Sequence, residues 1–292
     1  MPTVKVELES RPEALMLVRG MLTGVADLLG FNPELVHDLK TVVGEACNNV
    51  MLHAYDNGTT GPLTVGLRIG EETVEASVRD WGSGIRYVAP SVDRLHVGLA
   101  IISAVADQAQ FVRAPGGGTE VRMAFAGPTG ITALPRSADP HAYDPIPVEL
   151  SGDAVLTLSP VRLLRGVLAR VSTALAAQAH FSFERLHDLR RLTEELAAHA
   201  EAAACGEGVS AAIVVGSRRL ELAVGPFRPA GDMTAVAVGG SPRSSGDTRS
   251  PADAERGRPE AAFLALEAEL RIEPVAGAEI WRLVICDDRR PR

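Results

Sequence analysis

The sequence predicts an α+β fold in which one arrangement of strands and helices occurs twice in tandem. Segments whose apolar residues alternate predict strands, and segments whose apolar residues recur every three or four positions predict helices. The order of these segments in residues 1–126 recurs in residues 151–292. The length of 292 residues agrees with two domains, because domains of ~100–200 residues are usual and each half is long enough for its own core.

The composition is that of an ordinary globular protein and argues against several classes of function. Apolar residues make up 46% of the chain, charged residues 23% and aromatic residues only 4%, so the cores must consist mainly of aliphatic side chains. The net charge of −8 and the lack of a dense Lys/Arg block argue against nucleic acid or an anionic membrane as the main partner.

The cysteines and the apolar runs predict a cytoplasmic protein. Cys47, Cys205 and Cys286 are scattered, odd in number and without zinc-like spacing, which favours reduced thiols over disulfides. The amino-terminal residues alternate like a strand and contain no apolar signal core. No apolar run reaches the ~18 residues that a membrane span requires.

The first half is expected to begin with a strand and two helices. Apolar residues alternate over 4–8 and predict the strand. The Ser-Arg-Pro-Glu pattern at 10–13 is typical of a capping box before a helix. Asn32 and Pro33 predict the start of the next helix, which ends before 57–58. The apolar stripes are Leu15, Val18, Leu22, Val25 and Leu29 in the first helix, and Leu35, Leu39, Val42, Ala46 and Val50 in the second.

The rest of the first half is expected to consist of strands and one short helix. Alternation and turn residues predict the strands, and a short apolar run predicts the helix. Two strands, a loop, the helix and a hairpin around three successive glycines are expected at 63–70, 73–80, 85–97, 99–106, 110–114 and 120–126, in that order.

A proline-rich segment separates the halves. Residues 127–150 contain five prolines and predict a fairly stiff linker, because proline restricts φ. The expected domains are therefore 1–126 and 151–292. A second segment, 239–259, is rich in Gly, Ser, Pro, Arg and Asp and is expected to be mobile.

Four matches in the same order indicate an internal duplication. Chance similarity between amphipathic helices would explain any one of them, but four in one order favour a repeat. The matched segments are 18–22 with 164–168, 37–40 with 187–190, 70–78 with 216–224, and 111–122 with 270–281.

The second predicted helix carries a polar stripe. Glu45, Asn49 and His53 are spaced four residues apart, so they lie on one face, opposite the apolar stripe. An amide oxygen can bind Mg²⁺ without adding charge, and a carboxylate one turn away can accept a proton from an attacking hydroxyl. A solvated helix face would show the same pattern, so the stripe alone does not establish a site.

Three further positions have chemistry that suits a nucleotide. Asp80 ends a predicted strand, where a carboxylate can accept the amino group of adenine, and the glycines after it let the backbone approach a base. Gly98 begins a predicted helix, whose free N–H groups would favour a phosphate. Thr119 follows three glycines and could reach the base or a phosphate. Tight turns and an ordinary helix start are the structural alternatives.

Taken in order, these segments resemble the N, G1 and G2 boxes of the GHKL ATPase superfamily. More narrowly, they resemble the anti-sigma-factor serine/threonine kinases of bacterial partner switching. The resemblance covers roughly residues 5–126. It implies a two-layer α/β sandwich of the GHKL (Bergerat) type, with a mixed sheet and helices on one face, duplicated in tandem. It also implies that ATP and Mg²⁺ are bound.

The same resemblance implies roles for individual residues. Glu45 would be the general base, Asn49 the Mg²⁺ ligand and Asp80 the residue that binds adenine. His53 matches the end of the N box, where a structural hydrogen bond is an equal alternative. The other nucleotide-binding positions would be Gly82, Gly84, Ile85, Gly98, Leu99 and Thr119.

The leading hypothesis is a Mg-ATP-dependent protein serine/threonine kinase that phosphorylates a STAS-type anti-anti-sigma partner, with a sigma factor as a second candidate partner. The alternative is a non-catalytic ATP-binding module that sequesters a regulatory protein. At residues 96–98 this chain has less glycine than the family's second box often has, which bears on turnover more than on binding. A fragment of a gyrase- or MutL-type ATPase is disfavoured, because a second copy follows the first in place of an unrelated domain.

The second half is expected to have lost the nucleotide site. Proline has no acceptor side chain for adenine, and imidazole is softer than the oxygen ligands that Mg²⁺ prefers. We therefore expect a degenerate copy that does not bind ATP, packed against the first as an intramolecular pseudo-dimer, with a homodimer as the alternative. The matches place His199 at the position of Asn49, Pro226 at Asp80, Arg228 at Gly82 and Ala278 at Thr119.

Overall fold

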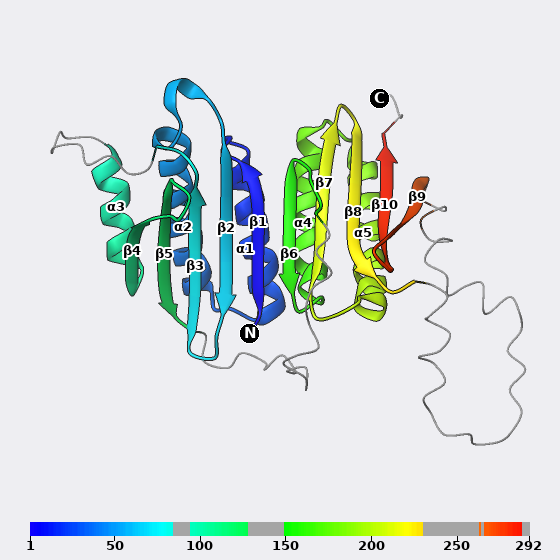
Figure 1. Ribbon diagram of the computed structural model, residues 1–292, viewed down its shortest axis with the longest axis horizontal. Helices are drawn as coiled ribbons and strands as arrows, with labels where there is room; N and C mark the ends of the chain where they lie inside the picture. The colour runs from blue at the N-terminus through cyan, green and yellow to red at the C-terminus, as the bar shows by residue number, and fades with distance from the viewer. Residues whose placement is uncertain (84–93, 128–148, 230–262, 264–265, 288–292) are drawn as a thin grey trace, which may run out of the picture.

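The computed structural model in Figure 1 describes residues 1–83, 94–127, 149–229, 263 and 266–287. Most of the predicted linker, the segment 239–259 and two predicted site residues, Gly84 and Ile85, lie outside these described residues. Among the helices that are described, none has both the length and the apolar character needed to cross a membrane.

Both halves contain the same order of strands and helices, except that α3 and the 3-10 turn of the first half have no counterparts among the described residues of the second. The first half consists of β1 (Thr3–Glu9), α1 (Ala14–Leu29), α2 (Pro33–His53), a 3-10 turn (Asp56–Gly58), β2 (Pro62–Ile69), β3 (Thr73–Asp80), α3 (Arg94–Val105), β4 (Gln108–Arg113) and β5 (Thr119–Ala126). The second consists of β6 (Ala154–Ser159), α4 (Leu163–Gln178), α5 (Phe183–Ala203), β7 (Val209–Gly216), β8 (Arg219–Phe227), β9 (Ala268–Val275) and β10 (Ala278–Cys286).

All ten strands form one sheet, in the order β4-β5-β3-β2-β1-β6-β7-β8-β10-β9, with α1, α2, α4 and α5 behind it in Figure 1. The α+β class is confirmed. The expected mixed sheet is wrong, because every described strand pairing is antiparallel. Each helix reverses the chain direction, so the two helices between β1 and β2 return an antiparallel neighbour. The single helix α3 does return a strand parallel to β3, but β5 lies between that strand and β3.

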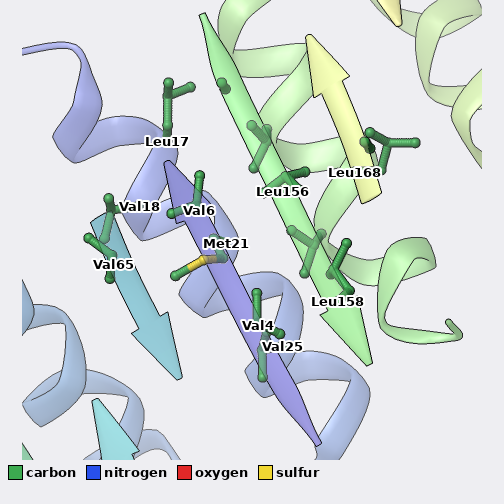
Figure 2. Close-up of a cluster of buried hydrophobic side chains, with 14 of the residues drawn as sticks. Val4, Val6, Leu17, Val18, Met21, Val25, Val65, Leu156, Leu158 and Leu168 are labelled. Atoms are coloured by element: carbon green, nitrogen blue, oxygen red, sulfur yellow. The ribbon is translucent and has the colours of Figure 1, made fainter. Parts of the chain in front are cut away.

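The halves join through their first strands, which pair antiparallel with Val6 opposite Leu156. Side chains from both halves, among them Val4, Met21 and Leu158, belong to one cluster of buried residues (Figure 2). We expected a core for each half, but the main core is continuous across the junction. Pairing β1 with β6 also removes an exposed sheet edge from each half, which leaves β4 and β9 as the outer strands.

Helices α1 and α4 approach each other closely behind this junction. A Cβ atom built on Gly24 would overlap the carbonyl oxygen of Gly166, and one built on Gly166 would overlap that of Gly24. The two glycines therefore allow backbone-to-backbone contact, which any larger residue would prevent. Asp27 of α1 and Arg170 of α4 form an ion pair beside the contact.

The starts of the first two helices differ in how well they were predicted. The side chain of Asn32 accepts a hydrogen bond from the Leu35 N–H at 2.8 Å and caps α2 as expected. The capping box at 10–13 is wrong, because the N-cap of α1 is Glu13, which makes no side-chain cap bond. Ser10 instead accepts a hydrogen bond from the Gly61 N–H at 3.0 Å, so its hydroxyl tethers the chain before β2.

The structure also defines how the helices of the two halves correspond. Gly30 and His180 both have positive φ, at 70° and 62°, after the first helix of their halves. Asn32 and Ser182 then cap the second helices. A constant shift of 150 positions relates these pairs, so the match of 18–22 with 164–168 is one helical turn out of register. An apolar stripe looks alike after a shift of about one turn, which explains the error.

A second correction concerns the last hairpin. Val121 pairs with Val78, and Trp281 pairs with Val224, which is the residue at the position of Val78. Trp281 therefore stands at the position of Val121, one residue away from the position that the match of 111–122 with 270–281 gave it, and the register on β8 shifts between Glu279 and Trp281. The cause is the turn: Val275 pairs directly with Ala278, whereas the first hairpin accommodates five residues, 114–118, between its paired ends.

Candidate functional site

Helix α2 presents Glu45 and Asn49 on the face that its apolar residues leave free. Both side chains are half-buried, while Val42, Ala46 and Val50 are buried in the core. Gly98 of α3 lies against the pair: a Cβ built there would be 3.1 Å from Asn49 Oδ1 and 3.3 Å from Glu45 Oε2. The structure thus brings together three predicted site residues from two helices.

The Asn49 amide has an unmet hydrogen-bonding need. Its Nδ2 atom is buried and has no hydrogen-bond partner in the part of the chain that the structure describes. Leaving such a group unpaired costs about 1–3 kcal/mol, which a ligand at this position would offset. The two amide ends can also exchange places by rotation of the side chain. An amide oxygen beside the Glu45 carboxylate forms a set of oxygen ligands that suits Mg²⁺.

Asp80 ends β3 on the helix-facing side of the sheet, and its side chain is only 4% exposed. Its Oδ1 atom accepts a hydrogen bond from the Gly82 N–H at 2.8 Å. Arg79 pairs with Glu120 across β3 and β5, so Asp80 and Thr119, which is also buried, are next to each other at the strand ends. The two predicted nucleotide contacts therefore belong to one corner.

Two glycines allow this corner to form. A Cβ on Gly82 would overlap the carbonyl oxygen of Ala54, and a Cβ on Gly118 would overlap that of Asp80. Gly118 also has a φ of 79°, which favours glycine. Sequence reasoning treated the glycine run before Thr119 as a hairpin turn, and its contact with Asp80 was not predicted.

The remaining predicted positions lie on α3, at the end of α2 and in the turn after β3. Leu99 is half-buried on α3, beside Gly98. Because α3 begins at Arg94, Gly98 lies beyond the first turn, so the expectation that it offers a helix end to phosphate is wrong. His53 is exposed at the end of α2. Trp81 is 40% exposed, with the Arg79 guanidinium 4.7 Å from its ring centre, as expected for a loop aromatic.

Tyr55 is a site residue that sequence reasoning missed. Its hydroxyl donates a hydrogen bond to the Pro62 carbonyl at 2.5 Å and accepts one from the Trp81 N–H at 3.1 Å. Burial raises the pKa of this hydroxyl, and the Asp80 carboxylate adds to the rise, so the phenol stays neutral and able to donate. The signal available in the sequence was only its place just after the polar stripe of α2.

A hollow of about 750 Å³ lies on the opposite face of the first-half sheet. Its lining includes the side chains of Lys5, Arg68 and Gln110, which point away from the helices. None of the predicted site residues lines it. The candidate site therefore lies on the helix-facing side of the sheet, where the Glu45 carboxylate, the Asn49 amide and Gly98 come together.

In the second half, the equivalent corner is filled with rings. The His199 ring stacks on Trp281 with centroids 3.8 Å apart, and Phe227 meets both rings edge-on. Phe263 contacts Trp281 from another side. Burial lowers the pKa of His199, although Glu279 opposes the shift. With Pro226 in place of Asp80, this corner presents apolar surface where the first half presents polar groups.

Comparison with known proteins identifies the type of domain in the first half. Residues 8–125 match the family model of the histidine kinase-like ATPase domain. This part of the chain is therefore a histidine kinase-like ATPase domain of the GHKL type.

The particular relatives are proteins named serine-protein kinase RsbW. The chain is 34% identical to that of Oceanobacillus iheyensis over 79 residues, which are 27% of this chain and 50% of the relative. It is 30% identical to that of Bacillus subtilis over 84 residues, 29% and 52% of the two chains. Against Listeria innocua the values are 36% over 80 residues, 27% and 51%. The chain thus spans about half the length of the relatives it matches.

Proposed function

We propose that the first half binds Mg-ATP and that this chain is a cytoplasmic protein serine/threonine kinase acting on a STAS-type anti-anti-sigma protein, with a sigma factor as a second partner. The observation that carries the proposal is the convergence of Gly98 on Glu45 and Asn49, because it joins a proton acceptor to a metal-binding amide. Similarity to proteins named serine-protein kinase supports the reaction class.

Each residue has a distinct role in this proposal. Mg-ATP would supply the phosphoryl group together with a cation that offsets its charge. Asn49 would hold the metal through its amide oxygen, and Glu45 would accept the proton of the attacking serine hydroxyl. Asp80 would accept a hydrogen bond from the adenine amino group while the Gly82 N–H holds its Oδ1 atom.

A second candidate is a module that binds ATP and sequesters a partner without phosphorylating it. The low glycine content at residues 96–98 favours this reading, because it bears on turnover more than on binding. Transfer of radiolabelled phosphate from ATP to a co-encoded STAS-domain protein separates the two candidates.

Replacing Glu45 by alanine tests the kinase directly. We expect phosphoryl transfer to fall by ~100-fold or more, as is usual for loss of a general base, while ATP affinity measured by calorimetry stays largely intact. Glu195 is the matched control, because it is exposed and stands at the same position in the second half. Glu195→Ala should transfer at the wild-type rate, and wild-type transfer by Glu45→Ala would sink the assigned role.

We also propose that residues 151–292 are a degenerate copy that binds no ATP and that pairs with the first half as a pseudo-dimer. The shared order of elements and the ring cluster at His199 and Trp281 support this. Calorimetry should give one ATP site per chain, and two equivalent sites would refute the proposal.

A further inference from the structure

The phenol of Tyr55 lies between the end of α2 and the ends of two strands. Tyr55 follows α2 by two positions, and its hydroxyl uses both of its hydrogen-bonding capacities at once. It donates to the Pro62 carbonyl at 2.5 Å, at the start of β2, and accepts from the Trp81 N–H at 3.1 Å, just beyond β3. One side chain thus links three elements.

The ring itself has a defined seat. A Cβ built on Gly61 would overlap the Tyr55 ring, so the ring lies directly on that glycine. The ring is half-buried there. Contact on one face and hydrogen bonds at the hydroxyl leave the side chain little freedom, because moving the ring breaks both bonds.

This arrangement acts on Asp80 through the turn that follows it. Trp81, whose N–H the phenol holds, is the residue between Asp80 and Gly82. Two residues after Trp81, the Ser83 N–H donates a hydrogen bond to the Ala54 carbonyl at 2.9 Å. The backbone on the far side of Asp80 is therefore tied to the end of α2 at two points, and the carboxylate has a defined direction.

The second half shows what the same junction looks like without a phenol. Cys205 stands at the position of Tyr55, 150 residues later. There the Cys205 N–H donates directly to the Pro226 carbonyl at 3.2 Å, and Ala204 forms a β-bridge with Phe227. The backbone after α5 thus bonds the last residues of β8 with no side chain between them, and rings fill the corner.

We propose that Tyr55 is a positioning residue for nucleotide binding: its phenol holds the turn after β3 to the end of α2 and so aims the Asp80 carboxylate at the ligand. The inference rests on the proposed function, since it assigns Asp80 to adenine. Tyr55 does not touch the ligand itself, and it acts through the turn at Trp81.

Tyr55→Phe tests this, because phenylalanine keeps the ring on Gly61 and removes both hydrogen bonds. We expect ATP affinity, measured by calorimetry on the full chain, to weaken about three- to tenfold, as the loss of a typical hydrogen bond would cause. The preference for ATP over GTP should also narrow, because a misdirected Asp80 reads the amino group poorly. A general loss of folding would weaken both nucleotides equally and leave the ratio unchanged.

Two further measurements sharpen the test. Hydrogen exchange at the Trp81 amide should speed up in Tyr55→Phe without nucleotide, since this N–H loses its acceptor. Thr59→Val is the control: the Thr59 hydroxyl donates to the Asp56 carbonyl within the neighbouring 3-10 turn, so affinity and selectivity should stay at the wild-type values.

The outcomes separate the inference from the function beneath it. If the wild type binds ATP and Tyr55→Phe matches it in affinity, ATP/GTP preference and Trp81 exchange, the role assigned to Tyr55 is wrong and the proposed function stands. If the wild type binds no nucleotide, both the proposed function and this inference fail.

Discussion

Replacing Gly98 by alanine would test whether close packing of α3 on α2 matters for function. The added Cβ would lie 3.1 Å from Asn49 Oδ1 and 3.3 Å from Glu45 Oε2, whereas comfortable contacts begin near ~3.5 Å. Either α3 or the two polar side chains must therefore shift by a few tenths of an ångström. A misplacement of about 1 Å can cost ~100-fold in rate, so this smaller shift should slow phosphoryl transfer roughly tenfold.

The same substitution should not destabilise the fold. Alanine is better than glycine inside a helix by up to ~1 kcal/mol, which offsets the strain of the contact. We therefore expect the Tm of Gly98→Ala to stay near that of the wild type while transfer to a co-encoded STAS-domain protein falls.

Gly44→Ala is the matched control for this experiment. Gly44 also lies within a helix, but the nearest atom to its added Cβ is Arg19 Nη2, 3.9 Å away. That variant gains the same helix propensity without pressing on the site, so it should transfer phosphate at the wild-type rate. Wild-type transfer and ATP affinity in Gly98→Ala would refute the reasoning that the glycine is needed for its close approach to Glu45 and Asn49.

Two other predictions concern the junction and the second half. Gly24→Leu should lower the free energy of unfolding by ~1–3 kcal/mol or more, because α1 and α4 meet backbone to backbone. Gly20→Ala is the control and should be nearly neutral, since its added Cβ would lie 3.7 Å from the Arg170 Cβ. Equal melting temperatures of Gly24→Leu and the wild type would contradict the packing. Burial lowers the pKa of His199 from its ordinary value of 6.5, so its neutral form supports folding above that pH, and stability is lost as pH falls through the lowered pKa. Denaturant unfolding of His199→Phe should therefore depend less on pH below 6.5, and identical slopes in the two proteins would disprove the link.

Local features of the chain were readable because they depend on neighbours in sequence. Alternation predicted β1, and helical spacing predicted α2 with Glu45 and Asn49 on one face. Asn32 was recognisable as a cap because the side chain bonds an N–H three residues away. Ser10 showed the limit of this reasoning, since its hydroxyl is used by Gly61, far along the chain.

Features that depend on distant contacts were misread or missed. The start of α3 at Arg94 placed Gly98 inside the helix, where it packs on α2. The match of the last hairpin was one residue out of register at Trp281, because the turn before β10 is shorter than the turn before β5. Tyr55 was overlooked because its two partners come from separate strands.

The sequence by itself determined the strands, the helices and the polar residues that one helix can display, because periodicity and capping act over a few residues. Only the tertiary structure decided that β1 pairs with β6, that two glycines let α1 and α4 touch, and that a tyrosine stands behind Asp80. Strand pairing and close backbone contacts join residues that are far apart in the chain. The spacing of residues within one segment does not predict which other segment will pack against it.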